Sequence, residues 1–153
     1  MKVAKVCFTG PRTIHKTQSL AIGGYLTDYI NLIIHKYDTC EFHVGDAKGV
    51  DMCVRDLLIQ LGLTPIIHTV LDKSSKSAYA MRSMQMVNSC LEADKCMIFG
   101  FPNKECPEMI TLRYPFCGSG SGTWATLAYA KSKGFYLNIH GLGRLSIPSW
   151  MSS

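Results

Sequence analysis

The sequence lacks a hydrophobic run long enough to cross a lipid bilayer. Its longest apolar stretches, such as residues 29–34, are far shorter than the roughly 20 apolar residues that a membrane-spanning helix needs. Lys2 and Lys5 interrupt the start of the chain before an apolar core typical of a secretion signal develops. We therefore expect a soluble, cytoplasmic protein.

The sequence also lacks the spacings that are typical of metal sites and disulfide frameworks. Its seven cysteines are an odd number, include no CxxC pair and mostly fall inside apolar segments, where a free thiol packs as a small hydrophobic group. Its five histidines include no i, i+4 pair. We expect reduced cysteines, no bound metal and no resident cofactor.

Charged residues are few, at 18% of the chain, and they form no dense basic block. The net charge of +5 is spread along the sequence, which favours small anionic ligands over duplex nucleic acid. No segment is of low complexity, and an apolar fraction of 47% is typical of a folded domain. We expect residues 1–140 to form one domain, with residues 141–153 as a tail packed on it.

What is present is an alternation of short apolar strands and amphipathic helices. Strands are expected at residues 3–8, 41–44, 65–70, 95–99 and 135–139. Apolar residues recur at helical spacing over residues 22–33, 50–61 and 80–91, and a fourth helical pattern covers residues 125–131. This alternation predicts an α/β fold: a single Rossmann-like, doubly wound, mainly parallel five-stranded sheet with helices on both faces.

Several local features refine this prediction. Thr17 or Ser19 is expected to cap the first helix, and Gly62 to end the second. Residues 109–112 are a candidate for a short extra strand inside the long connection of residues 100–117. Connections of that length without secondary structure are uncommon unless they are functional or mobile.

In a doubly wound sheet, ligands bind outside the carboxyl ends of the strands, where successive loops meet. Four of these loops combine glycines, which let a backbone approach closely, with hydroxyl, carboxylate or cationic side chains. The candidate ligand-binding residues are Thr9, Gly10, Pro11 and Arg12 in the first loop; Gly45, Asp46, Lys48, Gly49 and Asp51 around the second; Lys76, Tyr79 and Arg82 near the third helix; and Gly118, Ser119, Gly120, Ser121, Gly122, Thr123 and Trp124 in the last.

The run from Gly118 to Trp124 is the most informative of the four, because a Gly/Ser-rich turn that opens a helix presents backbone N–H groups to an anion. Trp124 itself either stacks on a base or anchors the core. Asp51 either caps its helix or accepts a hydrogen bond from a ribose hydroxyl. Arg12 either contacts a phosphate or points into solvent from a simple turn.

Taken together, four motifs of this chain resemble the SLOG superfamily, the Rossmann-like group that includes the SMF/DprA and LOG proteins. They are FTGPR at residues 8–12, VGDAKGVD at 44–51, MRSM at 81–84 and GSGTW at 120–124, so they span most of the chain. The second motif looks closest to the small YspA-like branch. The resemblance implies a homo-oligomer that binds a nucleotide, a nucleotide-derived signal or, in the DprA branch, single-stranded DNA.

LOG enzymes resemble one another in a glycine-rich motif whose glutamate assists cleavage of an N-glycosidic bond. Aligning Gly122 and Thr123 with that motif places Thr126 at the glutamate position, and a threonine supplies neither a negative charge nor a general base near neutral pH. The leading hypothesis is therefore a protein that senses, carries or sequesters a nucleotide or nucleotide-derived signalling molecule. The alternatives are a LOG-type nucleoside 5'-phosphate N-glycosidase with Asp46 or Asp51 as a relocated carboxylate, and DprA-type binding of single-stranded DNA.

Overall fold

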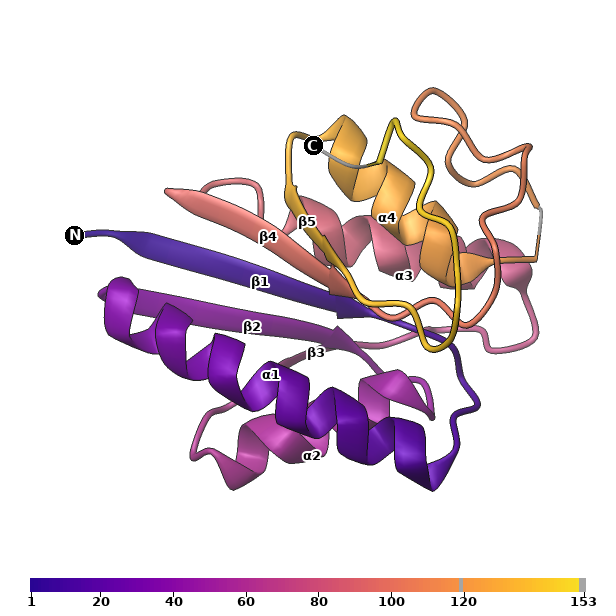
Figure 1. Cartoon of the computed structure of the whole chain (residues 1–153). Helices are drawn as coiled ribbons and strands as arrows, with labels where there is room; N and C mark the ends of the chain where they lie inside the picture. The colour runs from indigo at the N-terminus through magenta and orange to yellow at the C-terminus, as the bar shows by residue number, and fades with distance from the viewer. Residues whose placement is uncertain (119, 152–153) are drawn as a thin grey trace.

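Strands and helices alternate along the whole chain in the computed structural model, which describes residues 1–118 and 120–151. The elements are β1 (Val3–Thr9), α1 (Lys16–Lys36), β2 (Thr39–Gly45), α2 (Val50–Gln60), β3 (Ile66–His68), α3 (Lys76–Asn88), β4 (Lys95–Gly100), α4 (Gly122–Ser132) and β5 (Tyr136–Ile139) (Figure 1). In this part of the chain, no helix has the length and hydropathy that crossing a bilayer requires.

The five strands form one parallel sheet in the order β3-β2-β1-β4-β5. β1 lies at its centre, with Val6 opposite Phe42 of β2 on one side and Met97 of β4 on the other. Four consecutive residues at the end of β1, from Val6 to Thr9, are buried, because a central parallel strand is covered on both faces. The sheet confirms the expected five-stranded α/β fold.

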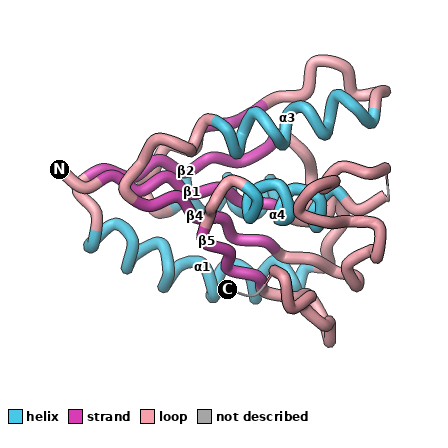
Figure 2. The backbone as a smooth tube through the Cα atoms, turned by 90° about the horizontal axis from the view of Figure 1, so that it is seen from above, coloured by secondary structure: helices cyan, strands magenta, loops and turns pink. Residues whose placement is uncertain are grey.

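Helices cover both faces of the sheet, as a doubly wound fold requires. α1 and α2 lie on one face and α3 and α4 on the other (Figure 1). Seen from above, α3 lies towards the β2 side of the sheet and α1 towards the β5 side (Figure 2). Ile22 and Leu26 of α1 and Val54 of α2 are fully buried against the first face, and Val87 of α3 and Leu127 of α4 are fully buried against the second. The two faces therefore have separate hydrophobic clusters.

The chain changes direction between β1 and β4, which are neighbours in the sheet. β1 leads to α1 on one face and β4 leads to α4 on the other, so the loops after these two strands diverge from a common edge. The Thr9 carbonyl at the end of β1 accepts a hydrogen bond of 3.0 Å from Phe101 N–H, just past β4. This divergence is the topological switch point at which such sheets bind ligands.

Three local expectations are wrong. The third strand covers residues 66–68 only, because the Asp46 side chain accepts the Val70 N–H at 3.1 Å and takes it out of the strand. Residues 109–112 form no strand, since Ile110 N–H donates to the Pro107 carbonyl in a turn. The first helix begins after His15, whose N–H donates to the Gln18 side chain at 2.8 Å, so Thr17 and Ser19 lie inside its first turn.

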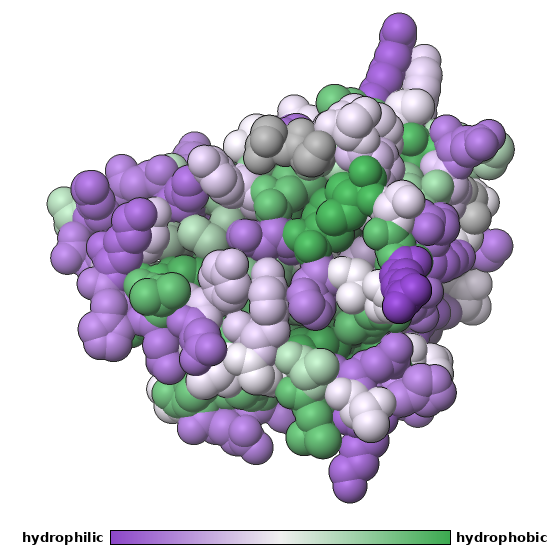
Figure 3. Space-filling view, viewed as in Figure 1, coloured by the Kyte–Doolittle hydropathy of each residue, from purple (hydrophilic) through white to green (hydrophobic). Residues whose placement is uncertain are grey.

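The C-terminal segment crosses back over the sheet after β5. Leu142 N–H donates to the Pro102 carbonyl at 2.7 Å, and the side chain of Met151 is buried in the same cluster as Trp124 and Phe135. On this face of the molecule, hydrophobic residues gather near the centre and hydrophilic residues cover most of the rim (Figure 3). The carboxyl ends of the central strands point towards the right in Figure 1.

Candidate functional site

The first two loops of the candidate site pack tightly against each other. A Cβ atom on Gly10 would overlap the side chain of Val50, and one on Gly49 would overlap the backbone of Pro11 and Arg12. Gly49 also has a φ of +74°, which side chains disfavour, and Val50 N–H donates to the Pro11 carbonyl at 3.1 Å. The close approach that these glycines allow is therefore between two protein loops, and it fixes the backbone that carries Arg12.

A buried ion cluster joins the second loop to α3. Arg82 Nη1 lies 3.0 Å from Asp46 Oδ1 and 3.7 Å from Asp51 Oδ2, and the three side chains are 12%, 14% and 7% exposed, respectively. Gly45 lies beneath this cluster, where a Cβ atom would overlap the Arg82 guanidinium. Asp46 therefore links the segment just after β3, through Val70 N–H, to α3, through Arg82.

Two acids share one arginine in this cluster, and Asp51 is the more deeply buried of the two. Burial raises the pKa of Asp51 to about 6, against the opposite effects of the Arg82 charge and of the Ala47 N–H, which donates to Asp51 Oδ2 at 3.2 Å. The sequence suggested a helix cap or a ribose contact for Asp51. The structure adds a place in an ion cluster between the second loop and α3.

Arg82 is engaged with carboxylates, whereas its neighbour in space, Arg12, is exposed. Among the described residues, Arg82 Nε is also buried without a hydrogen-bond partner. The Arg12 guanidinium carbon lies 3.8 Å from the centre of the Tyr79 ring, and that of Arg82 lies 6.0 Å from it. Lys48 and Lys76 are exposed near the starts of α2 and α3. Sequence reasoning named all five residues but missed the Arg12–Tyr79 stacking, which only the fold creates.

The glycine segment before α4 is open, in contrast to the first two loops. Gly118 and Gly120 have φ angles of +75° and +84°, and Cβ atoms on Gly118, Gly120 or Gly122 would meet no atom within 4 Å. The predicted site residue Ser119 lies outside the described residues. These glycines therefore leave room for another molecule at the backbone, which Gly10, Gly45 and Gly49 do not.

The first turn of α4 presents backbone N–H groups at this opening. Ser121 is the N-cap residue, and its hydroxyl accepts from Trp124 N–H at 3.3 Å. The N–H groups of Gly122 and Thr123 belong to the first turn, which intrahelical hydrogen bonds do not reach. Lys104, a residue that sequence reasoning missed, donates from Nζ to the Gly120 carbonyl at 3.1 Å. The one feature of the sequence that could have indicated Lys104 is its position in the long connection before α4.

Two further residues of α4 have structural roles. The Trp124 side chain is fully buried, and its Nε1–H donates to the Lys104 carbonyl at 2.7 Å, so the ring anchors the core and is closed to stacking on a ligand. Thr126, the residue that the sequence resemblance aligns with the LOG glutamate, is 1% exposed, and its hydroxyl donates to the Gly122 carbonyl at 2.7 Å. No carboxylate stands at that position.

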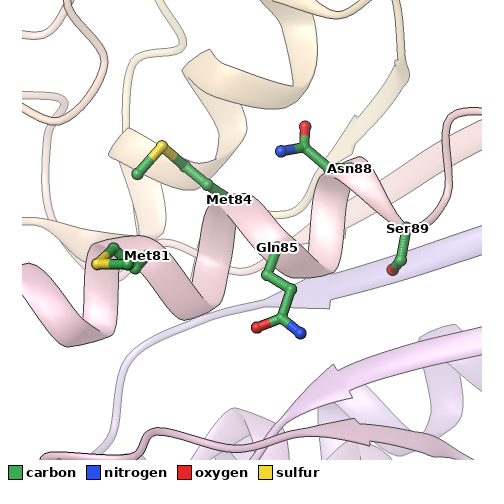
Figure 4. A pocket seen from close by; sticks show the side chains of 5 residues that line it. All are labelled: Met81, Met84, Gln85, Asn88 and Ser89. Carbon is green, nitrogen blue, oxygen red and sulfur yellow. The ribbon is translucent and has the colours of Figure 1, made fainter.

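Two surface pockets lie on the α3 and α4 face, away from the predicted loops. One of about 570 Å³ is lined by Met81, Met84, Gln85, Asn88 and Ser89, which lie on successive turns of α3 and just beyond its end (Figure 4). A second of about 410 Å³ lies between α3, α4 and the segment of residues 112–116. Both are shallow surface features, and neither contains a residue of the sequence-predicted site.

Comparisons of the chain with protein-family models, with curated proteins and with solved structures found no match. Within residues 1–118 and 120–151, no group of three or more His, Cys, Asp or Glu side chains is arranged to hold a metal ion. Function is therefore argued from the geometry of the carboxyl edge of the sheet, where the open glycine segment and the exposed Arg12 lie.

Proposed function

We propose that this protein binds a nucleotide or nucleotide-derived signalling molecule at the carboxyl edge of its sheet. The observation that carries this proposal is the open backbone of Gly118, Gly120 and Gly122 at the start of α4, beside the switch point between β1 and β4. A helix N-terminus at a switch point favours an anion, because backbone N–H groups and the helix dipole both point at it.

Phosphate is the anionic group that this edge suits best. The N–H groups of Gly122 and Thr123 would donate to phosphate oxygens, and the glycines before them leave space for the group to approach. Arg12 would add a guanidinium charge, and its stacking on Tyr79 holds it in place before a ligand arrives. The net charge of +5 supports attraction of an anion of this size.

The base would be held by planar groups other than Trp124, which is buried. Arg12 and Tyr79 form such a planar pair, with Arg12 in the loop after β1 and Tyr79 near the start of α3. Backbone N–H groups recognise phosphate without reading the base, so the identity of the base is a question for experiment. Sensing, carrying and sequestering the ligand all fit this arrangement.

Membership of the SLOG superfamily, a cytoplasmic location and a homo-oligomeric state belong to the same proposal. The order of the four motifs and the doubly wound sheet support the superfamily assignment. α1 exposes two large apolar side chains, Leu20 (69%) and Leu32 (67%), each of which would be available to a second copy of the chain.

The Asp46–Arg82–Asp51 cluster favours a second candidate function, cleavage of the N-glycosidic bond of a nucleoside 5'-phosphate. A carboxyl group with a pKa of about 6, as in Asp51, is able to exchange a proton near neutral pH. This candidate predicts slow release of free base from a nucleoside monophosphate. It also predicts that Asp51→Asn abolishes the release while leaving binding in place.

Native mass spectrometry tests both candidates in one experiment. The purified protein is mixed with a pool of mononucleotides, dinucleotides and cyclic nucleotides, and bound species and free products are followed over time. An intact adduct that is lost in Arg12→Ala supports the binding proposal. Arg113→Ala is the matched control, because Arg113 also lies over a tyrosine ring, 5.5 Å from Tyr114, but in the connection before α4. Absence of any adduct would contradict the proposal.

A further inference from the structure

A group of titratable side chains lies on the α3 face of the sheet, apart from the candidate ligand site. Cys7 in β1 and Cys90, two residues beyond α3, are both fully buried, and their sulfur atoms lie 3.2 Å apart. A disulfide has an S–S distance of about 2.05 Å, so closing a gap of about 1 Å would join them. Neither cysteine takes part in the proposed ligand site.

The imidazole-bearing residue His43 lies opposite Cys7 in the register of β1 and β2. Its Nε2 lies 2.9 Å from Glu41 Oε1 and its Nδ1 lies 2.9 Å from His68 Nε2. Although burial opposes it, interaction with Cys90 and Glu41 raises the pKa of His43. Hydrogen bonds from Cys7 and then His43 lower the pKa of Cys90, while burial raises that of Cys7. These opposite directions favour Cys90 as the nucleophile of the pair.

The turn at the end of α3 brings this group close to solvent. Ser89 is exposed, lies 3.3 Å from His43 Nδ1 through its hydroxyl, and lines the 570 Å³ pocket on α3 (Figure 4). Cys90, the next residue in the chain, is fully buried, whereas Ser89 lines the pocket. Because both thiols are fully buried, a small uncharged oxidant would reach them in preference to a bulky disulfide.

We propose that Cys7 and Cys90 form a reversible disulfide, with hydrogen peroxide as the oxidant. The Cys90 thiolate attacks one peroxide oxygen; an S–O bond forms, the O–O bond breaks, and the departing hydroxide takes a proton from His43 and leaves as water. Cys7 then attacks the Cys90 sulfur; an S–S bond forms, the S–O bond breaks, and the thiol proton of Cys7 leaves with the hydroxide as a second water. The two sulfurs lose two electrons and the peroxide gains them.

The disulfide would tie the end of α3 to the central strand of the sheet. It would close a loop from residue 7 to residue 90, and a cross-link over so long a loop restricts the unfolded chain strongly. We expect the oxidised protein to unfold at a temperature about 10 °C higher than the reduced protein. Reduction with dithiothreitol is expected to restore the original melting temperature.

The test is mass spectrometry of the wild-type protein after treatment with hydrogen peroxide and blocking of the remaining thiols. The expected result is a peptide pair that joins Cys7 to Cys90 with the loss of two hydrogen atoms, and that disappears with dithiothreitol. Oxidation of the exposed Met81 adds an oxygen atom instead, so its mass change is distinct. Recovery of Cys7 and Cys90 as blocked free thiols after other cysteines have oxidised would overturn the proposal.

Two variants separate the roles of the partners, after circular dichroism has shown that each is folded. In Cys7→Ala, Cys90 is expected to stop at the sulfenic acid, which dimedone captures once denaturant added after the peroxide treatment has exposed the residue. In His43→Gln, disulfide formation is expected to slow by about 10-fold, whereas the control His35→Gln, exposed on α1, is expected to match the wild type. Disulfide formation at an unchanged rate in His43→Gln would remove His43 from the mechanism. Absence of dimedone capture in Cys7→Ala would remove Cys90 as the nucleophile.

Discussion

Gly122 offers a substitution that separates ligand binding from folding. It is the first residue of α4, its backbone φ is not in the left-handed region, and a Cβ atom there meets nothing within 4 Å. Gly122→Asp therefore adds a carboxylate without a clash, at the point where the proposed phosphate would bind. Gly122→Asn adds a side chain of the same shape without the charge and is the matched control.

The aspartate is expected to stabilise the fold. A carboxylate in the first turn of a helix interacts favourably with the helix dipole by about 0.3–1 kcal/mol. The first turn of α4, all of whose residues the structure describes, contains no acidic residue, so this stabilisation is available to the variant. We expect the melting temperature of Gly122→Asp to rise by about 1–3 °C relative to Gly122→Asn, as measured by differential scanning fluorimetry without ligand.

Ligand binding is expected to change in the opposite direction. A unit negative charge about 4 Å from a phosphate charge costs about 1 kcal/mol in water and about 4 kcal/mol at an effective dielectric constant of 20. The Kd of the nucleotide that forms an adduct in native mass spectrometry should therefore rise by about 5-fold to 1,000-fold. Isothermal titration calorimetry measures it for both variants. Equal Kd values for Gly122→Asp and Gly122→Asn would refute the placement of phosphate at α4.

Three further predictions concern the loops that position the site. Gly49 has a φ of +74° and lies against the Pro11 backbone, so Gly49→Ala should lower the free energy of unfolding, measured in urea, by about 3 kcal/mol. Gly62 has a φ of +78° but lies in open space, so the control Gly62→Ala should lower it by about 1 kcal/mol. Equal losses would contradict the loop contact. Arg82→Gln should lower the free energy of unfolding by about 3 kcal/mol at pH 7, because it leaves two buried carboxylates without their cation. A loss below about 1 kcal/mol would contradict the ion cluster. The pKa of Asp51 is about 6 in the folded state, above its usual value of 3.8. Its contribution to stability is therefore complete below pH 3.8 and is lost as the pH rises through 6. The free energy of unfolding lost in this way is about 3 kcal/mol. Asp51→Asn should therefore flatten the pH profile of stability between these values, and an unchanged profile would contradict the burial of Asp51.

The fold was predictable from the sequence because its strands are central and its helices are amphipathic. The apolar run that forms β1 and the spacing of Ile22 and Leu26 in α1 both report burial directly. β3 was predicted too long, because nothing in residues 65–70 indicates that the Asp46 side chain, in the previous loop, accepts a hydrogen bond from Val70 N–H. Local sequence patterns do not predict where a strand ends when its end depends on a side chain from another loop.

The candidate site was predictable as a set of loops but not as a set of contacts. Glycines at Gly10 and Gly49 look like ligand-binding glycines in the sequence, yet they permit two loops to pack together. Gly118 and Gly120 look the same in the sequence, but they border open space. The pairing of Asp46 with Arg82 joins residues 36 positions apart, and only the crossing from β3 to α3 brings them together. Glycine spacing therefore locates the loops, and tertiary packing decides which of them remain accessible.

The most direct test of a ligand site at the start of α4 is a two-dimensional ¹H–¹⁵N spectrum of the protein. It is recorded during titration with the nucleotide that forms an adduct in native mass spectrometry. The largest shifts are expected on the amides of Gly120, Gly122 and Thr123 and on those around Arg12. Shifts concentrated on the α3 pocket around Met81 and Met84, or no shifts at any nucleotide concentration, would contradict a ligand site at the start of α4.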